Sequence, residues 1–76
     1  MADRMGRDVR VVYPANELAH SSLAKVFNAA TGRVVGVEMD GRTKLYRVLL
    51  DKPVEVEGVG LVEDDLWAGR YLVNRR

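Results

Sequence analysis

Residues 33–57 decide the fold and read RVVGVEMDGRTKLYRVLLDKPVEVE. Apolar and other residues alternate in three runs, 33–39, 44–51 and 54–57, which is the period of a β-strand. Asp40-Gly41 between the first two runs is typical of a tight hairpin turn, for which we expect type I′. Lys52-Pro53 between the last two runs predicts a second turn. The stretch therefore predicts three consecutive antiparallel strands.

The alternation also predicts which side chains these strands bury. Val34, Gly36 and Glu38 would then lie on the opposite face of the first strand from the buried positions. Run 44–51 is apolar on both faces, with Leu45 and Leu49 opposite the buried set, which indicates a central strand. The residues expected to share one core are Val35, Val37, Tyr46, Val48, Leu50, Val54 and Val56.

The residues that precede this stretch predict a strand and a helical segment. Residues 8–13 (DVRVVY) are β-branched and aromatic, and Pro14 ends the run. Residues 15–30 are rich in alanine, so we expect a helix of two to three turns, or else an ordered loop with one helical turn. Asn16 is the expected N-cap, and Gly32 is expected to end the segment in the left-handed conformation.

The residues that follow predict a bend, a turn and a last strand. Gly58-Val59-Gly60 interrupts the alternation and indicates a bulge or a sharp bend. Residues 63–69 (EDDLWAG) predict a single helical turn with its acids at the N-terminal end, and residues 70–74 predict the last strand. Residues 1–7 are expected to form a flexible arm, and residues 8–74 a single domain.

Five short strands in a chain of this length predict a mainly β fold, a small five-stranded barrel with one short helical segment after the first strand. This pattern resembles the SH3-like small barrels, including those of the KOW kind. The segment 15–30 is more helical than the corresponding loop of that superfamily. The resemblance implies no activity, because folds of this kind host many unrelated functions. The residues that carry it are Gly32-Arg33-Val34-Val35, Asp40-Gly41, Tyr46-Arg47-Val48 and Asp65-Leu66-Trp67.

Composition excludes several classes of protein. The 76 residues contain no cysteine, which rules out disulfides and thiolate zinc sites, and the net charge is only +1. No apolar run approaches the roughly 20 residues that span a bilayer. The N-terminus lacks the apolar region of a secretory signal, so we expect a cytoplasmic protein that does not enter membranes.

The chain offers no recognisable catalytic or metal-binding motif. His20 is the only histidine, and neighbouring helical residues do not face each other, so His20 and Ser21 cannot form a dyad. The acids at 63–65 lack the alternating spacing of a calcium loop. We therefore predict no catalytic residue, no metal ligand and no cofactor. An enzyme would need an active site shared between subunits, and this is the third hypothesis for the function.

Four residues are the candidates for ligand binding: Arg42, Trp67, Arg70 and Tyr71. Trp67 is expected to fill the core, and its alternative role is to stack on nucleic-acid bases. If the two ends of the domain meet, Arg4, Arg7, Arg10, Arg70, Arg75 and Arg76 form one basic patch, opposed by five acids within residues 55–65. The first hypothesis is a module for protein–protein contacts or self-association. The second is weak binding of RNA or single-stranded nucleic acid.

Overall fold

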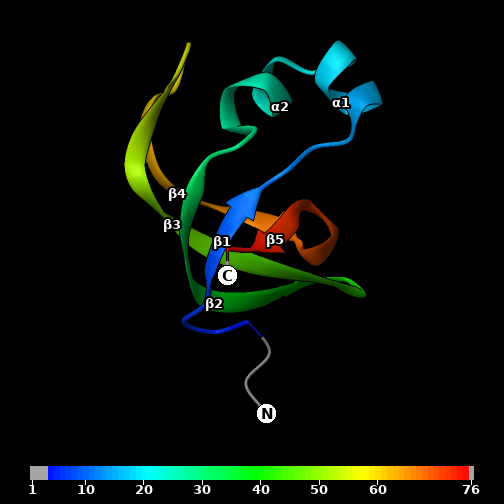
Figure 1. Cartoon of the computed structure of the whole chain (residues 1–76), viewed down its shortest axis with the longest axis vertical. Coiled ribbons are helices and arrows are strands. Elements are labelled where there is room, and N and C mark those ends of the chain that lie inside the picture. Colours follow the sequence, from blue (N-terminus) through cyan, green and yellow to red (C-terminus); the bar gives the residue numbers. More distant parts are fainter. Residues whose placement is uncertain (1–3, 76) are drawn as a thin grey trace.

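A computed structural model describes residues 4–75 and shows a mainly β chain with two short helices (Figure 1). The two helices follow the first strand, and a single turn of 3-10 helix, η1, precedes the last strand. The elements in chain order are β1 (Asp8–Val11), α1 (Ala15–His20), α2 (Ser22–Phe27), β2 (Thr31–Asp40), β3 (Thr43–Val56), β4 (Gly60–Ala68), η1 (Gly69–Tyr71) and β5 (Leu72–Asn74).

The five strands form one antiparallel sheet in the order β4-β3-β2-β1-β5. The first strand therefore lies between β2 and the last strand, which brings the two ends of the domain together. The prediction of five strands in a mainly β fold is confirmed. The sheet is not closed in the described residues, because β4 and β5 form its two edges and do not pair with each other.

The predicted β2–β3 hairpin is present. Asp40 pairs with Thr43, so the turn residues are Gly41 and Arg42, and of these only Gly41 has a positive φ, at 63°. A type I′ turn needs positive φ at both central residues, whereas a type II′ turn has glycine at the first. The prediction of a hairpin is confirmed, but the predicted type I′ geometry is wrong.

A β-bulge in β2 overturns part of the predicted core. The pairing with β3 shifts between Val34 and Gly36, which changes the phase of the alternation by one residue. Val34, opposite Val48, is buried in place of Val35, and Val37, although opposite Tyr46, is 40% exposed, so the prediction that Val35 and Val37 lie in the core is wrong. The prediction holds for Tyr46, Val48, Leu50 and Val56, which are buried, and Val54 packs against them in part.

The predicted turn at Lys52-Pro53 is absent, because β3 continues through it to Val56. Proline lacks an amide hydrogen and is tolerated in a strand only where no partner needs one. Pairing with β2 ends at Leu50, and pairing with β4 is interrupted between Leu49 and Val54. Pro53 lies in that gap, so the strand passes through it without losing a hydrogen bond. The separate strand predicted at 54–57 is therefore the second half of β3.

The strand β4 occupies most of the segment predicted as a helical turn. It runs from Gly60 to Ala68, and its acids lie on a sheet edge. The helical turn is η1, which begins at Gly69, the last residue of the predicted segment. The bend predicted at 58–60 is the turn that joins β3 to β4, with Gly58 and Gly60 both at positive φ. The last strand, β5, is shorter than the predicted 70–74.

The alanine-rich segment forms two helices instead of one. The break is at Ser21, whose Oγ accepts a hydrogen bond from the Ala24 amide at 3.1 Å and so caps α2. Asn16 is not the N-cap, since α1 begins after Pro14. Ala29, with φ of 70°, takes the left-handed conformation expected of Gly32.

Gly32 has a different role from the predicted one. It lies within β2, buried, where an added Cβ would overlap the Leu49 carbonyl oxygen of β3. A glycine is needed there because the two backbones approach too closely for any side chain.

The core joins all the strands to α2. Phe27 packs there, but Leu23 and Val26 of the same helix are exposed, so α2 does not cover the opposite face that carries Leu49, which is itself exposed. No helix formed by residues 4–75 is long and apolar enough to span a bilayer. The buried core residues are Val9, Val11, Phe27, Val34, Tyr46, Val48, Leu50, Val56, Trp67 and Leu72.

The start of the chain bonds to the sheet. Residues 1–3 of the predicted flexible arm lie outside the described residues. The Gly6 amide donates to the Val34 carbonyl at 2.8 Å, and Arg4 Nη1 donates to the Leu72 carbonyl at 3.0 Å. These bonds hold residues 4–7 against β2 and β5.

Candidate functional site

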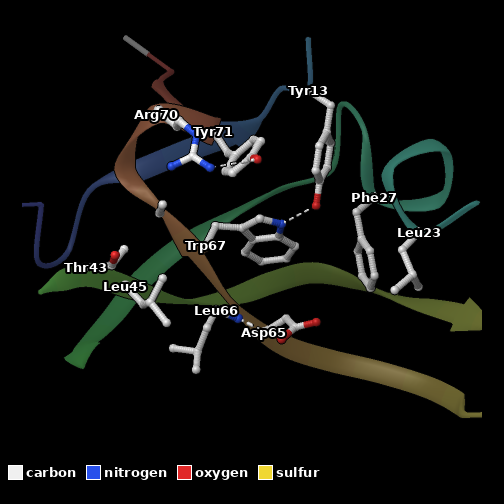
Figure 2. A pocket seen from close by; sticks show the side chains of 11 residues that line it. Tyr13, Leu23, Phe27, Thr43, Leu45, Asp65, Leu66, Trp67, Arg70 and Tyr71 are labelled. Carbon is white, nitrogen blue, oxygen red and sulfur yellow. Dashed lines mark hydrogen bonds between the residues drawn. The ribbon is translucent and has the colours of Figure 1, made fainter. Parts of the chain in front are cut away.

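Three of the four predicted binding residues lie together. Trp67 at the end of β4 and Arg70 and Tyr71 on η1 line one groove, to which Tyr13 contributes from the segment after β1 (Figure 2). Arg42 does not line this groove, because it lies in the β2–β3 turn. The structure therefore brings Trp67, Arg70 and Tyr71 together and places Arg42 apart from them.

Trp67 forms the floor of the groove and part of the core. Its side chain is 5% exposed, and its ring meets the Phe27 ring edge-on, with centroids 5.4 Å apart. The indole Nε1 donates a hydrogen bond to Tyr13 Oη at 2.7 Å. A buried indole N–H needs an acceptor, and Tyr13 supplies it. Trp67 thus fills the core, as expected, and leaves no free ring face for stacking.

Tyr71 forms the wall beside Tyr13. The two rings are tilted by 44° with centroids 4.9 Å apart. The Tyr71 hydroxyl donates to the Glu17 carboxylate, whose nearer oxygen is 2.9 Å away, and accepts from Arg70 Nη2 at 3.2 Å. The Arg70 guanidinium also lies over the Tyr71 ring, 4.6 Å from its centroid, within the range of a cation–π contact. These contacts fix the orientation of the Tyr71 ring.

The groove has a volume of about 400 Å³ and combines apolar and polar groups. Leu45 and Leu66 line it from β3 and β4, and Asp65 and Arg70 add opposite charges. One Asp65 oxygen accepts the Leu66 amide at 2.8 Å. An apolar groove with a few fixed polar groups is the usual form of a binding site.

The Tyr13 phenol supplies a hydrogen-bond donor. Burial disfavours the phenolate and raises the pKa of Tyr13 above its ordinary value of 10.0; the Trp67 bond opposes this rise, and the nearby Tyr71, Asp65 and Glu17 add to it. The phenol therefore keeps its hydrogen. Its bond to Trp67 uses only its acceptor side, and no group among residues 4–75 accepts its hydrogen. Tyr13 can donate that hydrogen to a ligand carbonyl.

Tyr13, one of the five aromatic residues of the chain, and Glu17 are not among the four binding residues predicted from the sequence. Each is bonded to a residue 54 positions later in the chain, Tyr13 to Trp67 and Glu17 to Tyr71. No local pattern reports a contact of that range. The one available signal was the tyrosine immediately before Pro14, at the end of the first strand.

The arginines of the predicted basic patch are partly used within the molecule. Arg75 pairs with Asp51 at 3.5 Å, Arg70 stacks on Tyr71, and Arg4 bonds to the Leu72 carbonyl and lies over the Tyr46 ring. Arg76 lies outside the described residues. What remains is a smaller basic surface on β1 and β5 than six free arginines would make.

No cluster of three or more His, Cys, Asp or Glu side chains within residues 4–75 could hold a metal ion. Comparisons with known proteins add no identity: no protein-family model, no curated protein and no solved structure matches the chain.

Proposed function

We propose that this chain is a protein-binding module of SH3-like architecture, whose groove at Trp67 holds an extended segment of a partner protein. The sheet order, the long connection after β1 and the 3-10 turn before β5 support the SH3-like fold. So does the core, in which Trp67 of the edge strand β4 and Leu72 of the opposite edge strand β5 belong to one cluster. A core shared by both edge strands is what a partly closed barrel would have.

The observation that carries the proposed function is the combination of groups in the groove. Extended segments bind to aromatic-lined grooves through their backbone carbonyls and alternate side chains. The Tyr13 hydroxyl can donate to such a carbonyl, and Leu45 and Leu66 offer a surface for an apolar side chain. Asp65, which borders the same groove, is placed to accept a basic side chain. The preferred ligand is therefore an extended segment with an apolar and a basic residue.

The order already present in the groove lowers the cost of binding. Tyr13 and Tyr71 are held by hydrogen bonds to Trp67 and Glu17 in the free protein. Ordering side chains on association costs about 0.5–1.5 kcal/mol for each mobile one. The aromatic wall avoids most of that cost.

The test is a selection from a phage-displayed library of random linear peptides, followed by NMR titration of the ¹⁵N-labelled protein with an enriched peptide. The amides of residues 13, 45 and 65–71 should shift. Leu66→Lys should weaken binding about tenfold or more, since it places a charge in the apolar part of the groove. Leu49→Lys is the matched control, because Leu49 is an exposed leucine outside the groove.

Two results would contradict the proposal. One is a library from which no peptide is enriched, and the other is a set of shifts that maps away from the groove. Asp65→Asn tests the charged and the apolar part of the ligand preference separately. It should weaken the binding of peptides that contain a basic residue and leave the binding of purely apolar peptides unchanged.

Nucleic-acid binding is less well supported. Base stacking needs exposed aromatic faces in a basic groove. Here Trp67 is buried, one face of Tyr71 is covered by Arg70, and the carboxylates of Glu17 and Asp65 lie nearby, where they repel phosphate. Titration of a labelled single-stranded oligonucleotide at two salt concentrations is the direct test, since phosphate binding weakens steeply with salt.

A further inference from the structure

A second apolar surface lies between α2 and the turn of the β3–β4 hairpin, on the side of the molecule where the helices and this hairpin project (Figure 1). This cleft, of about 480 Å³, is lined by Leu23, Val26, Val56, Glu57 and Val59 together with Ser22. Leu23 is 54% exposed and Val59 is 73% exposed. Turn positions normally carry glycine or polar residues. A valine exposed in the turn, beside two exposed apolar side chains of a helix, indicates a surface that another molecule covers.

The hairpin that forms this cleft is strongly acidic. Residues 55–65 carry five acids and no base. Within the described residues, the ion pairs include only one of these acids, Asp64, which lies 3.6 Å from Arg47. Lys25 on α2 is the base nearest in sequence to the apolar helix residues, and it does not balance five carboxylates. The partner of the cleft is therefore an apolar surface with positive charge.

This chain carries such a surface itself, on β1 and β5. Arg10 is the direct neighbour of Val73 in the sheet. Val73 is 52% exposed, and Val12, which follows β1, is 40% exposed. Asp8 of β1 is paired with Arg33, and Asp51 of β3 is paired with Arg75, which follows β5. None of the ion pairs of residues 4–75 includes Arg10. Its charge is thus available to a partner.

We infer that the cleft of one copy, which we call the hairpin cleft, binds the Arg10–Val73 face of a second copy. The two surfaces are complementary in charge, and both are partly apolar. The cleft lies at the β3–β4 hairpin and the Arg10–Val73 face on β1 and β5, so every copy carries both surfaces. Such a contact is head-to-tail and uses two different surfaces. It leaves one of each free on every dimer, and therefore builds a ring or an open chain of molecules.

The experiment uses two charge reversals, each of which removes one of the two surfaces. Glu57→Arg changes the hairpin cleft and leaves the Arg10–Val73 face intact, and Arg10→Glu does the reverse. Both sites are exposed, so both variants should fold, which circular dichroism checks. The mass of each protein is then measured by sedimentation velocity at low and high salt.

The wild type should show an average mass above the 8.5 kDa of one chain, rising with concentration and falling with salt. Each variant alone should self-associate at least about tenfold more weakly, because like charges then face each other. Mixed together, the two variants should associate with each other more strongly than either does with itself, because both the unchanged pair of surfaces and the pair with both charges reversed bring opposite charges together.

A wild type that stays at 8.5 kDa at high concentration and low salt would overturn the inference. So would a mixture in which the two variants fail to combine, because a symmetric dimer, and no head-to-tail contact, would then explain any association. Val59→Ser provides an independent variant without a change of charge, and it should weaken association at every salt concentration.

Discussion

The two halves of β3 differ sharply although one alternating pattern runs through both. From Thr43 to Leu50 the strand lies between β2 and β4, and its inward residues are buried, Val48 completely at 0% exposure. From Asp51 to Pro53 it pairs with neither neighbour, and from Val54 to Val56 it pairs with β4 alone. The first half is fixed on both sides and supports the groove, and the second half projects as the acidic hairpin. Burial thus follows from the number of neighbouring strands as much as from the sequence pattern.

The largest expected effect comes from Gly32, which lies opposite Leu50, where the doubly paired half of β3 ends. Gly32→Ala should destabilise the protein by about 4 kcal/mol, because the new Cβ meets a backbone oxygen of β3 that cannot move without breaking the sheet. Urea unfolding followed by circular dichroism measures the change.

Gly36→Ala is the control on the same strand. A Cβ there would lie 3.6 Å from the Cβ of Arg47, which is an ordinary contact, and the stability should change by less than about 1 kcal/mol. Equal losses in the two variants would show that β2 and β3 do not approach as closely at Gly32 as described.

A smaller effect compares two valines of β3 directly. Val48→Ala removes two methyl groups from the fully buried half and should cost about 2–3 kcal/mol. Val54→Ala makes the same change in the half that pairs only with β4, where the side chain is partly buried, and should cost about 1 kcal/mol. If the two losses measured by urea unfolding were the same, the difference between the halves would have no energetic basis.

The smallest expected effect is a pH dependence in the groove. Burial raises the pKa of Tyr13 in the folded protein above 10.0, so the protonated phenol is the form that folding favours. The free energy of unfolding should therefore gain its full contribution from Tyr13 below about pH 10 and lose it as the pH rises through the raised pKa. Urea titrations across this range measure the loss, which should be smaller in Tyr13→Phe. An identical loss in that variant would assign it to other groups.

Much of the fold could be predicted from the sequence, and the exceptions have physical causes. The hairpin at Gly41 and the burial of Tyr46, Val48 and Leu50 follow from local turn chemistry and alternation. The bulge after Val34 could not be predicted in this way, because it is a feature of the pairing between β2 and β3 and has no local sequence signal. Pro53 reads locally as a turn, and only the gap in pairing around it explains how a strand passes through.

The groove could be predicted only from one side. Trp67, Arg70 and Tyr71 are close in sequence and therefore close in space, whereas Tyr13 and Glu17 reach them across 54 positions. Arg42, the fourth predicted binding residue, lies in the β2–β3 turn. Residue type alone does not locate a side chain relative to a groove.

The position of β1 between β2 and β5 has a consequence for the order of folding during synthesis. Val9 is made before the residues of the other four strands, but its partner Asn74 emerges last of all the paired residues. At the usual rate of roughly 5–20 residues per second, the β2–β3–β4 meander can form while β1 still has an open edge. Pairing over so long a stretch of chain is also a slow step in refolding. A nascent chain that has not yet exposed residues 72–74 therefore presents an unpaired β1 to chaperones and to other nascent copies.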